Sequence, residues 1–67
     1  MKVKAFVFRT SSGEITAAYY DMQRLEYRTF SQKRYFEGAD SIKAGTYVNL
    51  IVRRQERGYK AVRILYF

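Results

Sequence analysis

The sequence predicts an all-β domain in the form of a five-stranded small barrel. Apolar and polar side chains alternate with a period of two residues, which is typical of half-buried strands. The four glycines fall between the apolar runs, at positions 13, 38, 45 and 58, where turns need residues that tolerate positive φ. A chain of 67 residues has room for one domain. We therefore expect residues 1–67 to form a single barrel, because closure removes the edges that a short open sheet exposes.

The N-terminal part predicts two strands joined by a hairpin turn. Residues 2–9 place Val3, Ala5 and Val7 on one face of a strand, and Lys2, Lys4, Phe6 and Phe8 on the other. The polar segment 10–13 ends in glycine and predicts the turn. In residues 14–20, Ile15, Ala17 and Tyr19 alternate with Thr16, Ala18 and Tyr20, which predicts the second strand.

The segment 21–36 admits two interpretations. Asp21 could be a helix N-cap, with Met22, Leu25 and Thr29 at helical spacing, which would give a ββαββ arrangement. We favour a third strand over residues 25–30, because tyrosine, threonine and phenylalanine fit a pleated surface well. Residues 31–45 are too long for a hairpin turn and are expected to be a connector. Within it, Asp40 and Ser41 could cap a short helical turn.

The C-terminal part predicts a second hairpin. Residues 46–54 alternate most clearly, with Val48, Leu50 and Val52 expected to point inward and Tyr47, Asn49, Ile51 and Arg53 outward. Residues 55–58 predict a tight turn. The fifth strand is expected to run from there to the C-terminus, with Val62 and Ile64 inward and Ala61, Arg63 and Leu65 outward. The apolar ending Ile64-Leu65-Tyr66-Phe67 is expected either to close the barrel against the first strand or to form a homodimer interface through the C-terminal strand.

Several segments are similar to those of a known family. Val3-Lys4-Ala5-Phe6 resembles an opening V-K-W-F, and Glu26-Tyr27-Arg28-Thr29-Phe30-Ser31 resembles V-F-V-H-F-S. Gly45-Thr46-Tyr47-Val48-Asn49-Leu50, followed by Arg57-Gly58-Tyr59-Lys60-Ala61-Val62, is similar to a closing hairpin G-x-x-V-x-F and K-G-x-x-A-x-x-V. These segments resemble the cold-shock domain, which has the oligonucleotide-binding (OB) fold. The resemblance implies an OB-like barrel with single-stranded nucleic acid as its ligand, although an SH3-like barrel is nearly as compatible with the strand spacing.

The sequence departs from this family where the family contacts bases. Ala5 replaces a tryptophan, Thr29 replaces a histidine, and residues 11–20 contain no counterpart of K-G-F-G-F-I. The resemblance also points Glu26 and Arg28 toward the barrel interior, whereas simple alternation points both outward. An unpaired charge in the interior is costly, so the two arguments conflict at this strand.

Charge and residue types limit the function classes. The chain has 13 Lys and Arg against 6 Asp and Glu, for a net charge of +7 and a pI near 10.0, which predicts an anionic partner. It contains no histidine and no cysteine, and its carboxylates are scattered, so we expect no catalytic site, metal or other cofactor. No apolar run is long enough to predict a signal peptide or membrane span, and we expect a cytoplasmic protein.

Aromatic and basic side chains are interleaved in a pattern that predicts a nucleic-acid-binding surface. Unpaired bases stack on aromatic rings while Lys and Arg contact phosphates. The candidate residues are Lys4, Phe6, Phe8, Tyr20, Tyr27, Arg28, Phe30, Lys33, Arg34, Tyr35, Arg53 and Arg54. Structural alternatives are that a loop or second subunit covers Phe6 and Phe8, and that Tyr35 and Phe36 close the barrel end.

We therefore expect a binder of single-stranded RNA or DNA with low sequence specificity. The alternative function is a small protein-interaction module, such as a phage- or plasmid-type modulator that binds an acidic surface of a host or regulatory protein. A role at a membrane surface is disfavoured, because the cations do not lie opposite one apolar helix face.

Overall fold

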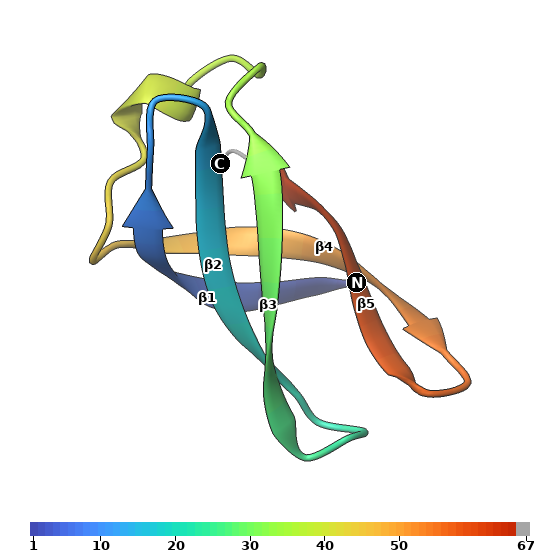
Figure 1. Ribbon diagram of the computed structural model, residues 1–67. Coiled ribbons are helices and arrows are strands. Elements are labelled where there is room, and N and C mark those ends of the chain that lie inside the picture. The colour runs from blue at the N-terminus through green and yellow to red at the C-terminus, as the bar shows by residue number, and fades with distance from the viewer. Residues whose placement is uncertain (66–67) are drawn as a thin grey trace.

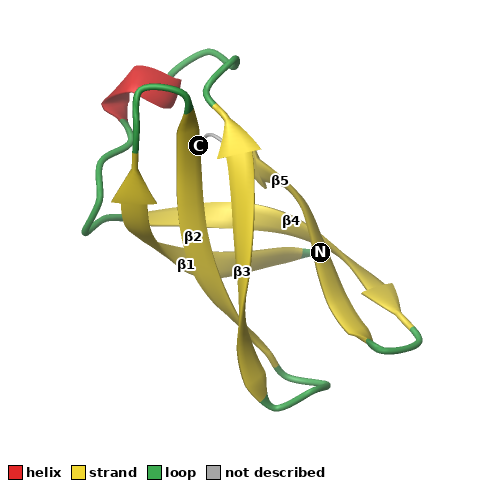
Figure 2. Cartoon of the chain, viewed as in Figure 1, coloured by secondary structure: helices red, strands yellow, loops and turns green. Residues whose placement is uncertain are grey.

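The computed structural model describes residues 1–65 as five antiparallel strands and one short helix (Figures 1 and 2). In chain order the elements are β1 (Lys2–Thr10), β2 (Glu14–Asp21), β3 (Glu26–Lys33), the 3-10 helix η1 (Ala39–Ser41), β4 (Tyr47–Gln55) and β5 (Gly58–Leu65). The strand order is β3-β2-β1-β4-β5, and the outer strands β3 and β5 approach each other in a nearly closed barrel. The predicted five-stranded OB-like barrel is confirmed, and the ββαββ alternative is wrong.

The core lies inside the barrel and is made of the side chains that alternate inward. Its members are Ala5, Val7, Ile15, Ala17, Tyr19, Val48, Leu50, Val52, Ala61 and Ile64, with Ala39 and Ile42 from the connector. Phe36 also packs against this cluster, as the structural alternative for that residue predicted. Tyr35 does not, because its side chain is 87% exposed.

Strand β1 belongs to both halves of the barrel. Its first half pairs with β4 from Lys2 opposite Ile51 to Phe6 opposite Tyr47, and its second half pairs with β2. In the pairing of β1 with β2, a β-bulge inserts Phe8 as an extra residue between Val7 and Arg9. A bulge bends a strand and increases its twist, and β1 indeed turns upward beside β2 after crossing behind it (Figure 1).

The fifth strand shows one error of the simple alternation. A second bulge places Val62 as an extra residue, because Ile51 and Val52 are consecutive in β4 but lie opposite Arg63 and Ala61. The inward positions are therefore Ala61 and Ile64, both buried, while Val62 is 40% exposed. The prediction of Val62 as an inward residue and Ala61 as an outward one is wrong, because one inserted residue reverses the alternation beyond it.

Neither Asp21 nor the segment 40–41 caps a helix in the way that the sequence predicted. The Asp21 carboxylate accepts hydrogen bonds from the amides of Gln23 and Arg24, as an N-cap would, but the chain forms a tight turn that ends with Leu25 at φ 55°. The third strand therefore begins at Glu26 and extends past Phe30 to Lys33. The predicted helical turn near residue 40 exists as η1, but Gly38 precedes it and no side chain caps it.

In the apolar C-terminal run, Ile64 is buried in the core and Leu65 ends β5, whereas Tyr66 and Phe67 fall outside the described residues. The homodimer through the C-terminal strand stays a prediction. Within residues 1–65 no helix is long and apolar enough to cross a membrane.

Gly58, the first residue of β5, is required both by its backbone and by its surroundings. Its φ is 112°, and a Cβ at this position would meet Asp21 Oδ2 and lie 2.6 Å from Arg24 Cδ. We predict that Gly58→Ala lowers the free energy of unfolding by about 2 kcal/mol or more, since an unfavourable φ alone costs roughly 1–3 kcal/mol. Urea unfolding measures this loss. Gly13→Ala is the control, because a Cβ there meets nothing within 4 Å, and an equal loss in both variants would contradict the prediction.

Candidate nucleic-acid interface

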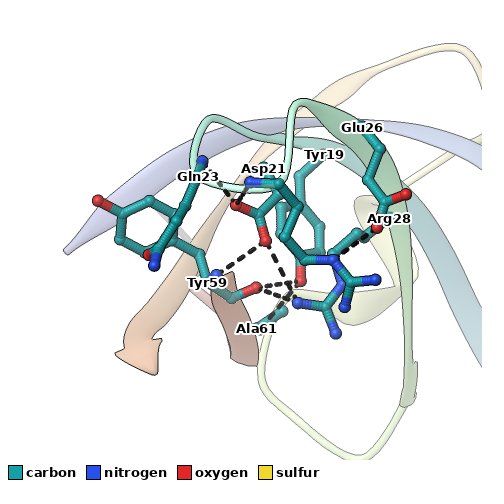
Figure 3. A network of polar contacts seen from close by, with 8 residues as sticks. Tyr19, Asp21, Gln23, Glu26, Arg28, Tyr59 and Ala61 are labelled. Atoms are coloured by element: carbon teal, nitrogen blue, oxygen red, sulfur yellow. Dashed lines mark hydrogen bonds and ion pairs between the residues drawn. The ribbon is translucent and has the colours of Figure 1, made fainter. Parts of the chain in front are cut away.

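A network of polar side chains closes the barrel between β3 and β5 (Figure 3). The Tyr59 amide donates to Asp21 Oδ2 at 2.8 Å, and the Tyr59 carbonyl accepts from the Tyr19 hydroxyl and from Arg28 Nη1, both at 2.8 Å. The Ala61 amide donates to the Tyr19 hydroxyl at 3.3 Å. Side chains thus satisfy backbone groups at a strand edge that would otherwise be buried without partners.

Asp21 is the centre of this network, and its side chain is fully buried. Burial alone would raise the pKa of its carboxyl. Hydrogen bonds from the amides of Arg24, Tyr59 and Gln23 and from the Arg28 guanidinium outweigh that effect, so the pKa of Asp21 lies below its usual value. The carboxylate therefore holds the fold together in its ionised form and leaves no free position for an external ligand.

Two candidate site residues on β3, Arg28 and Phe30, point to the inner side. The register places Arg28 opposite Tyr19 and Phe30 opposite Ala17, both of which face the interior. Phe30 packs against the core, and Arg28 is used in the closing network. Neither side chain lies on the outer surface with the other candidates, and the inward position that the family resemblance implied for Arg28 agrees with the register. Its charge is paired with the Asp21 carboxylate at 3.3 Å.

The candidates that follow β3 are divided among different roles. Arg34 donates to the carbonyl oxygens of Ser11 and Ala39, at 3.2 and 2.9 Å, and so links the β1–β2 turn to the connector. Its side chain is only 14% exposed, so we reassign it from phosphate binding to support of the fold. Lys33, the last residue of β3 and paired with Glu14, and Tyr35, which lies beyond the strand, are both exposed at this same end.

The outer surface holds two edge-to-face aromatic pairs. Phe6 and Tyr47 lie on β1 and β4 with ring centroids 5.4 Å apart, and Tyr20 and Tyr27 lie on β2 and β3 with centroids 5.0 Å apart. Tyr27 is 75% and Tyr47 61% exposed. Such pairs prefer this geometry and add about 0.5–1.5 kcal/mol beyond burial. Each pair therefore fixes its rings while leaving part of their surface open to solvent.

The two pairs are neighbours across β1 and β2. Phe6 lies opposite Ala18, and Tyr20 is two residues further along β2 on the same outward side. Diagonal neighbours of this kind are about 7–8 Å apart, within reach of aromatic side chains. We call the four residues Tyr47, Phe6, Tyr20 and Tyr27 the aromatic band.

Cationic and further aromatic side chains border the band. Lys4 Nζ lies 5.9 Å from the centroid of the Tyr47 ring, within the range of a cation–π contact. Phe8, the extra residue of the β1 bulge, is 45% exposed. The structure thus brings Lys4, Phe6, Tyr20 and Tyr27 together, as predicted, and leaves Phe8 uncovered within residues 1–65. Tyr47 also belongs to this surface but is absent from the candidate residues. The alternation in residues 46–54 predicts its outward position, whereas its place beside Phe6 follows only from the β1–β4 register.

The remaining candidates lie elsewhere. Arg53 and Arg54 are exposed in β4 just before the turn to β5. A shallow hollow near that turn is lined by Gln23, Arg24, Glu56 and Arg57. Within residues 1–65 no group of three or more His, Cys, Asp or Glu residues could hold a metal ion.

No protein-family model matches the chain, and no curated protein or solved structure is significantly similar to it. Fold and surface together define a small OB-like barrel with an exposed aromatic band on its outer side.

The closing network makes a prediction about acid stability. Because the pKa of Asp21 is lowered in the folded state, its ionised form stabilises the fold fully above the unfolded pKa of about 3.9, and this stabilisation is lost as the pH falls through the lower folded value. We expect Asp21→Asn to be less stable than the wild type at pH 7, and to lose less stability between pH 5 and pH 2. Urea unfolding across this pH range measures both effects.

Asp40→Asn is the matched control, because that carboxylate is fully exposed and lies 4.0 Å from Arg34. The control should follow the wild-type pH profile. An Asp21→Asn profile that falls as steeply as that of the wild type would refute the assignment.

Proposed function

We propose that this protein is a non-catalytic binder of single-stranded RNA or DNA, with bases stacked on the aromatic band and phosphates held by Lys4 and other nearby cations. The observation that carries the proposal is the presence of four aromatic side chains, contiguous across β4, β1, β2 and β3, on the outside of a basic barrel. An exposed aromatic surface of this extent indicates a partner. The net charge of +7 favours a polyanion.

The geometry suits unpaired bases better than a duplex. Every base has a flat aromatic face, and stacking on a protein ring contributes about 1–3 kcal/mol per base with little dependence on sequence. In a duplex those faces are already stacked on neighbouring bases, so only an unpaired strand can use the band. The edge-to-face contacts hold the rings before binding, which reduces the conformational entropy lost on association.

This mode of binding gives affinity without strong base preference. Stacking recognises the presence of a base, whereas discrimination among bases requires hydrogen bonds to base edges. We therefore place the protein among cytoplasmic nucleic-acid chaperones, regulators or strand-protecting proteins. The resemblance of its strands to the cold-shock domain supports the same class of ligand.

The proposal predicts which side chains control affinity. We expect Tyr27→Ala and Phe6→Ala each to weaken binding of a labelled single strand by about 5- to 150-fold, the equivalent of one lost stacking contact. If about four to six phosphates are neutralised, log affinity should fall with log salt concentration at a slope of about −3 to −4. Fluorescence anisotropy with RNA and DNA strands at several salt concentrations measures both quantities.

Tyr35→Ala is the matched control, because Tyr35 is exposed but lies beyond the far end of β3 from Tyr27. It should leave affinity nearly unchanged. Equal losses for Tyr27→Ala and Tyr35→Ala would show that the band is not the site. Salt-independent or absent binding to every strand would favour the protein-interaction module instead, and a nuclease-treated pull-down would then identify a protein partner.

A further inference from the structure

The positive charge of the protein is concentrated on one half of the barrel. Strands β1, β4 and β5 contain no Asp or Glu, and carry three, two and two Lys or Arg residues respectively. The rest of the chain has six Lys or Arg and six Asp or Glu, so its formal charge is zero. The whole net charge of +7 therefore belongs to these three neighbouring strands.

Four of these cations lie together on the outer surface. Lys2 pairs with Ile51, which in turn pairs with Arg63, and Arg53 lies directly opposite Lys60. Neighbouring strands are about 4.8 Å apart, so the backbone positions of Lys2 and Arg63, two strands apart, are about 10 Å from each other. The Arg53–Lys60 pair lies two residues, or about 7 Å, further along the strands. We call Lys2, Arg53, Lys60 and Arg63 the cationic face. All four are exposed, and none forms an ion pair within residues 1–65.

This arrangement is unfavourable in the free protein. Like charges directly opposite each other on antiparallel strands are destabilising, and Arg53 and Lys60 have this relation. A carboxylate at either position would remove the repulsion, yet none is present on the three strands. An anionic ligand would compensate for the repulsion on binding.

The chemistry of the face favours phosphates over bases. The nearest ring of the aromatic band on β4 is that of Tyr47, four residues from Ile51 and hence about 13 Å away. Within residues 1–65 no ring of the aromatic band lies beside these cations, so the face offers charge for a sugar–phosphate backbone rather than a platform of stacked rings. The backbone positions of these cations are about 7–10 Å apart, and their long side chains can reach phosphates on both strands of a duplex across its minor groove, which is about 6 Å wide.

The two surfaces are contiguous but differently directed. Lys4 and Asn49 form the pair that lies between the Phe6–Tyr47 pair and the row that contains Lys2 and Ile51. Figure 1 looks onto β2 and β3, with β4 and the first half of β1 crossing behind them. A ligand that leaves the band at Tyr47 thus crosses the Lys4–Asn49 pair before it reaches the cationic face.

We propose that the preferred substrate is a junction between single-stranded and duplex nucleic acid, with the unpaired strand on the aromatic band and the duplex backbone on the cationic face. This inference rests on the proposed function for its single-stranded arm. The cationic face adds a binding surface that needs no unpaired base. Linking the two contacts in one ligand makes the second contact intramolecular, which raises the overall affinity.

The test compares three ligands in RNA and DNA form. The first is a single strand of about 10 nucleotides, which is within the usual site size of such barrels. The second is a duplex of about one helical turn, or about 10 base pairs, closed by a non-nucleotide linker. The third is the same duplex with the single strand attached as a 5′ or 3′ tail. We expect the tailed duplex to bind the wild-type protein about tenfold or more tightly than the free strand. A tailed duplex that binds no better than the free strand would overturn the inference.

Variants separate the two surfaces. Lys60→Glu with Arg63→Glu should abolish the advantage of the tailed duplex and the binding of the blunt duplex. Lys43→Glu with Arg57→Glu changes the net charge equally at two exposed positions outside the three strands, and should preserve the advantage. Equal effects of the two double variants would reduce the cationic face to a contribution of net charge and overturn the inference.

Stability provides a readout that does not depend on ligand. Lys60→Glu places a carboxylate opposite Arg53, so it should raise the midpoint of urea unfolding while weakening junction binding. A lowered midpoint would contradict the claim that the cations repel each other. The two proposals can also fail separately. If the wild type binds the duplex but not the single strand, and the double variant Lys60→Glu with Arg63→Glu loses duplex binding, the proposed function is refuted. The cationic face then stays assigned to duplex phosphates.

Discussion

The structure depends on how the edge of β5 is closed. Within residues 1–65, the main-chain ladder runs from β3 to β5 through β2, β1 and β4 and leaves the outer edge of β5 without a paired strand. Three β5 amides on that edge, those of Tyr59, Ala61 and Ile64, donate instead to side-chain oxygens. Each such bond contributes about 0.5–1.5 kcal/mol net, and an unsatisfied buried amide costs more. Polar side chains therefore complete a barrel that backbone pairing alone leaves open.

The spacing of those three amides is itself a consequence of a bulge. In a regular strand every second amide faces the same edge, and Tyr59 and Ala61 follow that rule. Val62 is the extra residue of the β4–β5 register, so the next edge-facing amide is that of Ile64, which donates to Gln32 Oε1 at 2.6 Å. The same insertion directs Val62 outward. One irregularity thus determines which amide makes the third closing bond and places Val62 on the outer surface.

The sequence predicts the five strands, the turns at residues 10–13 and 55–58, and the faces of residues 2–8, 15–20 and 47–53, because strong alternation and turn residues are local signals. Alternation alone does not predict the inward position of Arg28 and Phe30, because the face of β3 is decided by its pairing with Tyr19 and Ala17 on another strand. Nor does it predict the bulges at Phe8 and Val62. The support role of Arg34 depends on carbonyl oxygens 23 and 5 residues away. In the candidate site, the aromatic residues of β1 and β2 could be predicted from the sequence, whereas the membership of Tyr47 follows only from its pairing with Phe6 in the β1–β4 register.

The closure of the barrel and the candidate site both follow from the alternation of inward and outward side chains along β1 and β2. Tyr19 and Asp21 must point inward to reach β5, so Tyr20 between them is forced outward, where it meets Tyr27. In the same way Ala5 and Val7 fill the core and leave Phe6 outside against Tyr47. Phe30, Phe36 and Tyr59 pack against the core, whereas the four rings of the aromatic band lie on the outer surface. Their solvent exposure is a cost that stability alone does not explain, and it supports the proposal of a ligand with flat aromatic faces.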